Sequence, residues 1–403
     1  MPDPNAPDYL EAGSTRYRMA NFAMFIGGFA TFALLYSTQP LLPLLTTTFK
    51  ISPAYASLSV SAGTAALALM LIPASILSDR LGRVPVMKWA LALSAVISLL
   101  CVMVSDYHQL LILRALLGAT LAGLPAAAMA YLGEEVAPAA QGKAIGLYIA
   151  GNALGGMSGR IAAALLTDLG GWRISLLVLG LLGLAAAIAF WRTLPSSRHF
   201  RARAAALNRI AGDTRTILAD TSLPWLFLTS LLAMGAFISV YNYLGFRLVD
   251  HPFQLSQSAV GAVFLLYLIG SWASALAGQL ADRHGRHRVQ WIMVLIMATG
   301  LALTLSDTLL VLLGGVGIFT FGFFATHSIS SSWVAHRGKA QRGLATAIYL
   351  SCYYLGASFI GSLTGYAWDW GKWYGLSTAI AACLALLMGV VLRLRWLARQ
   401  QVL

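Results

Sequence analysis

Two nine-residue stretches of the sequence share one pattern: SILSDRLGR at residues 75–83 and GQLADRHGR at residues 278–286. Each contains Asp-Arg-x-Gly-Arg, and each ends an apolar run long enough for a helix that crosses a membrane. Glycine permits a tight backbone turn between two antiparallel helices, while arginines remain at the level of the lipid headgroups. The pattern therefore predicts two equivalent helix–helix turns on one side of a membrane.

Three shorter motifs recur in the same order at an offset of about 201 residues. A single short match is expected by chance, but four matches in order indicate a duplicated unit with parallel halves. In transporters built from parallel repeats, the substrate site lies between the halves near the membrane midplane. The shorter pairs are Ser105-Asp106 with Ser306-Asp307, Ala140-Gln141 with Ala340-Gln341, and Asp168-x-Gly170-x-Trp172 with Asp369-x-Gly371-x-Trp373.

The composition is that of a membrane protein: of 403 residues, 59% are hydrophobic and 10% are charged, and the mean hydropathy is +0.75. Soluble domains contain about 25% charged residues, so an ordinary cytosolic enzyme is excluded. Lipid cannot satisfy backbone polar groups, and barrel-like alternation is absent, so the spans are predicted to be helices. The predicted spans are about 20–45, 56–77, 85–105, 109–133, 144–166, 174–191, 223–246, 256–280, 289–306, 309–334, 344–366 and 375–392.

A polar, arginine-rich stretch from Arg192 to Ser222 separates the first six spans from the last six. The predicted fold is an all-α integral membrane protein with twelve transmembrane helices in two pseudo-symmetric six-helix bundles. Residues 1–192 form the first bundle, residues 193–222 a basic cytoplasmic linker, and residues 223–403 the second bundle.

The distribution of positive charge predicts the orientation of the chain. With both termini in the cytoplasm, 21 of the 27 Lys and Arg residues fall in cytoplasmic segments and four in outer loops. We therefore expect a multi-pass protein of a bacterial inner membrane with both termini inside. Topology and contact with anionic lipids account for the net charge of +13, so no nucleic-acid partner is expected.

No motif in the sequence indicates a metal, a cofactor or an enzyme. The cysteines Cys101, Cys352 and Cys383 lie in apolar runs without the spacing of metal ligands or of a disulfide framework. The segment before Arg18 lacks the basic region and cleavage site of a secretory signal, so the first span is expected to be retained. Nothing in the sequence indicates an oligomer, and we expect a monomer.

The repeated Asp-Arg-x-Gly-Arg turn resembles the signature loop of the major facilitator superfamily, and the resemblance covers essentially the whole chain. The first copy departs from the family pattern at Ser75, where glycine is usual, and at Val84, where a basic residue is usual. The resemblance implies that the loop gates the cytoplasmic side through ion pairs that break as the halves rock; a fixed topological anchor is the alternative. The implied gating residues are Asp79, Arg80, Gly82 and Arg83, with Glu134 and Glu135 as partners of Arg83, and more weakly Asp282, Arg283, Gly285 and Arg286.

Several phrases narrow the resemblance within this superfamily. They resemble the YnfM-type branch of bacterial inner-membrane transporters and the broader arabinose-efflux and drug-efflux groups. The phrases are Leu35–Pro40, Gly151-Asn152, Gly156–Arg160, Ser197–Phe200 and Tyr353–Gly356.

Two arginines lie within predicted spans, where a charge by default marks a functional site. Arg114 resembles the fourth-helix arginine that the superfamily ties to proton coupling, although Leu117 departs from that motif; a structural arginine that binds backbone carbonyls is the alternative. Arg160 lies toward the outer end of span five. It is expected to pair with Asp168 or to attract an anionic substrate group.

Span five also carries glycines at every fourth position: Gly151, Gly155 and Gly159. Glycines four apart line one helix face and allow another backbone to approach closely, so they predict helix packing. Together with Gly146 they resemble the fifth-helix antiporter motif of exporters in the superfamily, from which Arg160 departs because the motif has proline there.

Polar and aromatic residues in the middle of spans are the candidate lining of a central cavity. An aromatic lining suits a planar or amphipathic ligand, including a cationic one. Each residue alone could equally form an interhelical hydrogen bond or belong to an interfacial belt. The candidates are Tyr36, Gln39, Asn152, Tyr241, Asn242, Tyr267, His327, Tyr349 and Tyr353.

All 14 acidic residues fall outside the middle of the spans. Many exporters of cationic drugs use a carboxylate there, so its absence leaves room for neutral or anionic substrates. For proton coupling the candidates are Asp79, Glu134 and Glu135 together with Arg114, Arg160 and His327. His327 titrates in a useful range unless burial prevents it. A lone His on an apolar helix is otherwise a neutral hydrogen-bonding residue.

The expected function is secondary active export of a small molecule, drug-like or a metabolite, driven by protons through alternating access. An importer or facilitator of a sugar or metabolite with the same fold is the alternative. A channel, a sensor and a membrane-embedded enzyme are remote alternatives.

Overall fold

The computed structural model describes residues 9–202, 207–338 and 341–400, with side chains omitted at 207–210. Within these residues the chain is helical and contains no strand. The first half comprises α1 (Thr15–Leu35), η1 (Gln39–Leu41), α2 (Leu42–Phe49), α3 (Pro53–Leu81), α4 (Arg83–Leu100), η2 (Cys101–Met103), α5 (Tyr107–Leu121), α6 (Gly123–Glu135) and α7 (Pro138–Thr193). After α8 (Leu207–Leu218), the second half comprises α9 (Leu223–Val249), α10 (Gln257–Ala262), η3 (Val263–Leu266), α11 (Tyr267–His284), α12 (Arg286–Leu303), α13 (Leu309–Arg337) and α14 (Arg342–Gln400).

Two helices are each long enough to hold two of the predicted spans. The backbone of α7 leaves helical geometry at Gly170 and Gly171, and that of α14 does so at Gly371 and Lys372. These breaks are 201 residues apart, the same offset as the sequence motifs. The tryptophan that follows each break is buried. The duplicated motifs therefore occupy equivalent places in the two halves.

The repeated Asp-Arg-x-Gly-Arg stretches form the two tight turns that the sequence predicts. Gly82 (φ +102°) ends α3 and precedes α4, and Gly285 (φ +87°) ends α11 and precedes α12. Left-handed φ values favour glycine because it has no Cβ.

Nine helices of the described chain are long and apolar enough to cross a membrane. Broken α7 and α14 are among these nine, whereas α12, whose first turn is the polar Arg286-His287-Arg288, is not. An all-helical membrane fold is confirmed, and the count of twelve spans stays a prediction.

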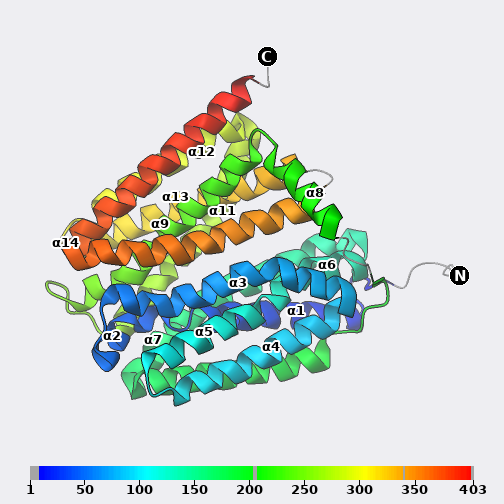
Figure 1. The fold of residues 1–403 in the computed structure, drawn as a ribbon, viewed down its shortest axis with the longest axis horizontal. Coiled ribbons are helices and arrows are strands. Elements are labelled where there is room, and N and C mark those ends of the chain that lie inside the picture. The colour runs from blue at the N-terminus through cyan, green and yellow to red at the C-terminus, as the bar shows by residue number, and fades with distance from the viewer. Residues whose placement is uncertain (1–8, 203–206, 339–340, 401–403) are drawn as a thin grey trace, which may run out of the picture.

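The helices form two bundles that meet along one side and diverge toward the other (Figure 1). The beginning of α1, the end of α14 and α8 lie where the bundles diverge. One continuous apolar core runs through both bundles, while smaller cores lie inside each bundle alone. The main contacts between the bundles pair α3 with α14 and α7 with α10.

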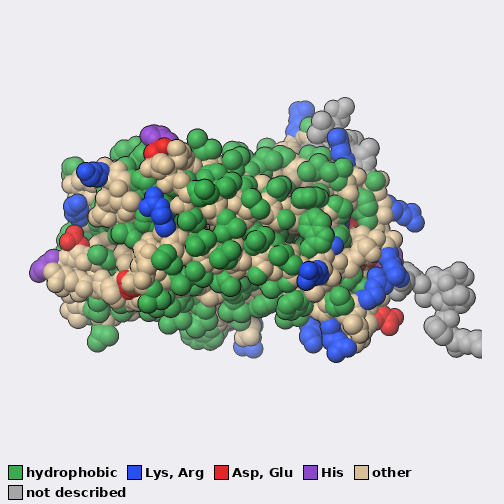
Figure 2. Space-filling view, turned by 90° about the horizontal axis from the view of Figure 1, so that it is seen from below, with side chains coloured by type: hydrophobic (Ala, Val, Ile, Leu, Met, Phe, Trp, Pro, Cys, Tyr) green, Lys and Arg blue, Asp and Glu red, His purple; other side chains and the backbone are tan. Residues whose placement is uncertain are grey.

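The outer surface carries a broad hydrophobic band, with most Lys and Arg of the visible face toward the end where the bundles diverge (Figure 2). Large apolar side chains such as Leu310 and Phe359 are mostly exposed. A helical protein with such a band has the surface that lipid requires.

Candidate functional site

The first span is interrupted where it reaches the interface between the bundles. We predicted one run over residues 20–45, but α1 ends at Leu35 and the chain restarts in η1 and α2. Pro40 has no backbone N–H and cannot continue the helical hydrogen bonding. The interruption leaves the carbonyl groups of Leu34 and Leu35 to find other donors, and it places Tyr36 and Gln39 at the interface.

Arg114 on α5 supplies those donors. Its Nη1 donates to the Leu34 carbonyl at 3.0 Å, its Nη2 to the Leu35 carbonyl, and its Nε to the Ser59 carbonyl at 2.9 Å. The side chain is 1% exposed. Its Nη1 also lies 3.4 Å from the Ser37 hydroxyl. The three carbonyl acceptors lie at a helix end or on a neighbouring helix, as the structural alternative for Arg114 expects.

A cavity of about 460 Å³ lies between the two bundles. It is lined from α1 and α7 on one side and from α9, α11, α13 and α14 on the other. Six of the predicted cavity and coupling residues meet there, although they come from four different helices and from the residue that caps α1. These residues are Tyr36, Asn152, Arg160, Tyr267, His327 and Tyr353.

Arg160 is buried at the wall of this cavity, with 2% of its surface exposed. Its guanidinium carbon lies 3.9 Å from the centre of the Tyr36 ring and 5.1 Å from that of Tyr267. Its Nε donates to Gln39 Oε1 at 2.5 Å, and its Nη1 donates to a backbone carbonyl one turn earlier on α7. The predicted pairing with Asp168 does not form, because Asp168 instead accepts hydrogen bonds from the backbone and hydroxyl of Ser258.

Gln39, Tyr241 and Asn242 lie beside the cavity and do not line it. Gln39 Nε2 donates to Asn242 Oδ1 at 2.8 Å, which joins the first half to the second. The Tyr241 hydroxyl contacts the Thr320 hydroxyl at 2.8 Å. All three side chains are almost fully buried. Gln39 begins η1, which leads directly into α2, and α2 lies at the end of the molecule away from α8 (Figure 1), so Gln39 and Asn242 form a contact between the bundles at that end of the cavity.

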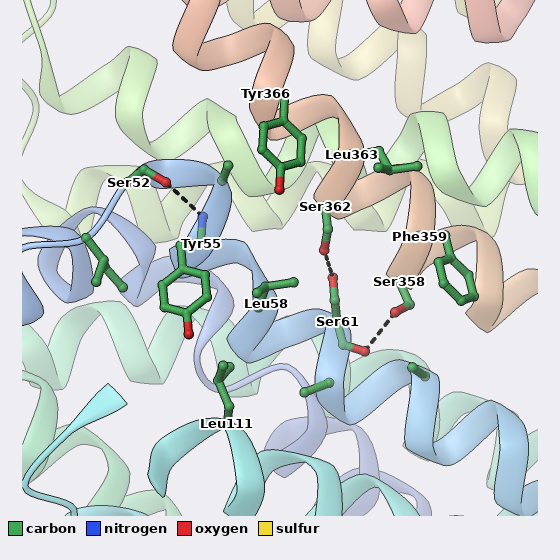
Figure 3. Close-up of a pocket in the computed structure, with 14 residues that line it drawn as sticks. Ser52, Tyr55, Leu58, Ser61, Leu111, Ser358, Phe359, Ser362, Leu363 and Tyr366 are labelled. Carbon is green, nitrogen blue, oxygen red and sulfur yellow. Dashed lines mark hydrogen bonds between the residues drawn. The ribbon is translucent and has the colours of Figure 1, made fainter. Parts of the chain in front are cut away.

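Two serines of α14 extend this closure along α3. Ser358 donates to the Ser61 carbonyl at 2.9 Å, and Ser362 donates to the Ser61 hydroxyl at 2.6 Å (Figure 3). A groove of about 680 Å³ runs beside these bonds and is lined by Tyr55, Phe359 and other residues of α3, α5 and α14. All three serines line this groove, so their hydrogen bonds join the two bundles at its wall.

His327 projects from α13 into the cavity wall and contacts two tyrosines of α14. Its Nδ1 lies 3.0 Å from the Tyr349 hydroxyl, and its ring centre lies 4.8 Å from that of Tyr353. Tyr349 is itself buried and does not line the cavity. Tyr349 and Tyr353 were predicted to share one helix face, and both contact His327 of α13.

Aromatic residues that the sequence analysis missed make up much of the remaining wall. The rings of Phe237 and Phe323 stack 3.8 Å apart, and Phe237, Phe324 and Tyr354 line the cavity. Phenylalanines in an apolar run carry no local signal that separates a cavity wall from a lipid-facing surface. Tyr354, directly after Tyr353, could have been included.

The glycines at every fourth position of α7 lie against α1. A Cβ added at Gly151 or Gly155 would lie 2.3 or 2.0 Å from a backbone carbonyl of α1, and one at Gly159 would lie 2.5 Å from Ala33. Any side chain there would push the helices apart. The backbones of α1 and α7 are therefore in close contact beside the cavity. This contact sets the position of Asn152 and Arg160, which both lie on α7, relative to α1.

The first Asp-Arg-x-Gly-Arg turn carries a dense set of polar contacts. Arg83 forms an ion pair with Asp79, binds Glu134 through Nε at 3.3 Å and Nη2 at 3.0 Å, and donates to Ser78 at 2.8 Å. Arg83 is 7% exposed, and its guanidinium lies over the Phe200 ring of the linker. Arg80 is exposed.

Glu135 was predicted to be a partner of Arg83, but it binds the beginning of the linker instead. Its carboxylate accepts hydrogen bonds from the backbone N–H groups of Arg198 and His199 at 2.9 to 3.0 Å. It therefore holds the beginning of the linker against α6, and Glu134 alone of this pair contacts Arg83.

In the second turn, Asp282 and Arg283 are exposed. Arg286 reaches the Ser332 hydroxyl at 3.5 Å, and no ion pair is formed by these three residues in the described part of the chain. The end of α13, Ala335-His336-Arg337, offers no carboxylate in the role of Glu134.

The sequence matches the Major Facilitator Superfamily over residues 24–251 and 248–401. The chain belongs to the major facilitator superfamily. It is therefore a multi-pass membrane transporter of this fold. The resemblance stated from the motifs is confirmed.

Two relatives that are similar over most of this chain are also transporters. The chain is 42% identical to the inner membrane transport protein YnfM of Escherichia coli over 96% of its own length and 93% of that protein. It is 36% identical to an MFS-type transporter, YybF, of Bacillus subtilis, over 91% of each chain.

Solved structures confirm the fold at much lower identity. A bacterial homologue of the human lysosomal transporter Spinster, in an inward-facing conformation, matches with a TM-score of 0.78 at 17% identity over 96% of this chain and 98% of that one. The nucleoside transporter NupG matches with a TM-score of 0.72 at 17% identity over 93% and 99%.

Proposed function

We propose that this superfamily member is a proton-driven exporter of a small organic molecule in a bacterial inner membrane, working as a monomer by alternating access. The observation that carries the proposal is the 460 Å³ cavity between the bundles, which has aromatic walls and a buried cation. A site shared by two rigid bodies can be exposed to either side by rocking of the bundles.

The state described here is proposed to be inward-facing. The charge distribution favours a cytoplasmic location for the side that holds α8 and the two ends of the described chain. Hydrogen bonds between bundles lie along α3, α14 and the Gln39–Asn242 contact, on the other side of the cavity. The Spinster homologue of the same fold was also captured facing inward.

In this proposal each set of residues has one task. The aromatic lining and Arg160 hold the substrate, and the first Asp-Arg-x-Gly-Arg turn with Glu134 stabilises the closed cytoplasmic side in the opposite state. His327 exchanges the proton, because it is the imidazole of the cavity lining and its Nδ1 contacts the Tyr349 hydroxyl. Arg114 keeps the interruption of the first span in place.

Export can be tested in proteoliposomes or inverted membrane vesicles. A panel of dyes, antibiotics, sugars and organic acids is screened for accumulation in inverted vesicles with an imposed proton gradient. We expect saturable accumulation that a protonophore abolishes. Uptake in right-side-out vesicles without a gradient would instead support the importer or facilitator.

The role of His327 needs a matched pair of variants. His327→Gln keeps a hydrogen-bonding group for Tyr349 but cannot carry a proton, so we expect driven flux to fall while substrate exchange at equal pH persists. His336→Gln, on the same helix but outside the cavity, is the control. Equal loss of driven flux and exchange in His327→Gln would assign His327 to binding only.

A further inference from the structure

Arg160 is a buried cation without an acidic partner. Its hydrogen-bond acceptors are a side-chain amide and a backbone carbonyl, and no Asp or Glu of the described chain bonds to it. A charge inside a membrane protein is costly unless it is paired. Because Arg160 lines the cavity, a negative group of a ligand can supply the missing partner.

The donors of Arg160 are only partly used. Nε and Nη1 have acceptors, whereas no described residue accepts from Nη2. A guanidinium presents two parallel N–H groups that match a carboxylate, and such a bidentate pair is stronger than a bond to a neutral amide. The Tyr267 hydroxyl nearby is buried without a hydrogen-bond partner among the described residues, so it can donate to the same group.

The walls next to Arg160 are aromatic. Tyr36 and Tyr267 flank the guanidinium, and Phe237, Phe324 and Tyr353 continue the surface. Ring faces bind planar apolar groups, and no carboxylate lines the cavity to attract a cation. The cavity therefore suits a planar organic monoanion better than a cationic dye.

The same guanidinium is tied to the closure on the far side. Arg160 donates to Gln39 Oε1, and Gln39 donates through Nε2 to Asn242 of the other bundle. Hydrogen bonds in a chain polarise and strengthen one another. A carboxylate that takes Arg160 away from Gln39 would thus weaken the bond between the bundles.

We propose that Arg160 binds the carboxylate of a planar organic anion, and that the chain Arg160–Gln39–Asn242 converts this binding into release of the closed side. The inference rests on the proposed function in taking the cavity as the substrate site. Binding and opening are measured without a proton gradient, so their failure is distinguishable from a failure of export.

Binding is tested on the purified full chain with three probes of one shape: 2-naphthoate, neutral 2-naphthamide and cationic 2-naphthylmethylammonium. We expect 2-naphthoate to bind and the other two to bind more than about tenfold less tightly, because the ion pair is lost. In Arg160→Gln the preference for 2-naphthoate should disappear. Arg173→Gln, which alters an arginine outside the cavity, is the matched control.

Opening is followed by alkylation of a cysteine placed by Val260→Cys, a buried position beside Gln39 at the closure, in a chain whose three native cysteines are replaced by alanine. 2-Naphthoate should speed alkylation several-fold, and Arg160→Gln should remove this effect. Gln39→Leu should give fast alkylation without a ligand while it retains binding of 2-naphthoate. Ala357→Cys, buried on α14 one residue before Ser358, reports general loosening of the fold.

Equal binding of the three probes, or full binding of 2-naphthoate by Arg160→Gln, would overturn the assignment of Arg160. An alkylation rate unaffected by 2-naphthoate and by Gln39→Leu would overturn the link to the closure. If both results are as expected and no driven flux is seen, the inference stands and the exporter proposal fails.

Discussion

The two Asp-Arg-x-Gly-Arg turns differ in what surrounds them. In the first, Arg83 is buried against Asp79 and Glu134; in the second, Arg286 meets a serine hydroxyl. The glycine turns have the same left-handed backbone. The two copies thus share the glycine turn that connects two antiparallel helices. Glu134, the carboxylate that completes the ion-pair cluster around Arg83, belongs to the first copy.

The largest expected difference between the copies is in transport. Asp79→Asn removes one of the two carboxylates that hold Arg83, and we expect driven flux to fall by about tenfold or more at an unchanged amount of protein in the membrane. Asp282→Asn changes an exposed side chain and should lower flux less than about twofold. Normal flux in Asp79→Asn would contradict the gating role, and equal losses would make the two turns equivalent.

The second difference concerns stability. Arg83→Gln leaves a carboxylate cluster without its cation, so the free energy of unfolding should fall by about 2 kcal/mol. Arg286→Gln should cost less than about 0.5 kcal/mol because the hydrogen bond from Arg286 to Ser332 is long and exposed. Thermal unfolding of the purified variants in one detergent compares them, and a larger loss in Arg286→Gln would reverse the comparison.

The glycines should show where the copies are alike. Gly82→Ala and Gly285→Ala each place a Cβ on a left-handed residue, and each should cost about 1 kcal/mol. The same unfolding measurement applies. A variant that loses no stability would show that its turn relaxes to another conformation.

The smallest expected effect is on the linker, which each half holds differently. Burial favours the neutral form of Asp220, but hydrogen bonds from Arg337 and from the N–H groups of Ser222 and Leu223 outweigh it and hold the pKa of Asp220 below its ordinary value. A depressed pKa means that the stabilisation is present at neutral pH and is lost as the pH falls through the folded value.

This effect can be measured as the difference in unfolding temperature between the unchanged chain and Asp220→Asn. We expect a small, constant advantage of the unchanged chain at pH values well above the ordinary Asp pKa of about 4, which shrinks as the pH falls below that value. Asp282→Asn, which changes an exposed acid, is the control. An advantage that grows on acidification would contradict the depressed pKa.

Much of the fold could be predicted because its signals are local. Three such signals can be recognised along the chain. They are apolar runs long enough to cross a membrane, a glycine flanked by charged residues between two runs, and motifs that recur in the same order. The interruption of the first span was missed, although Pro40 and Pro43 were visible. An interruption at these prolines frees carbonyl groups that need new hydrogen-bond donors. One such donor is Arg114, which lies about 80 residues away in the sequence.

The lining of the cavity was predicted in part. Tyr36, Arg160 and His327 were recognised because polar groups inside apolar runs are rare. Their relations were not: Arg160 was expected near Asp168, yet it reaches Gln39, 121 residues earlier in the chain. Side-chain partners on different helices depend on how the helices rotate and tilt against each other, and a one-dimensional pattern does not specify either.

The sequence by itself determined that this chain is a duplicated helical membrane protein of the major facilitator superfamily. Hydropathy and glycine turns reflect contacts with lipid and between residues close in sequence, and motif order is a property of the sequence itself. These features can therefore be recognised without coordinates. Only the tertiary structure decided that Arg114 supports a broken helix while Arg160 faces the cavity, and that Gln39 joins Arg160 to Asn242. Burial and hydrogen bonding between distant helices assign different roles to two arginines that look alike in sequence.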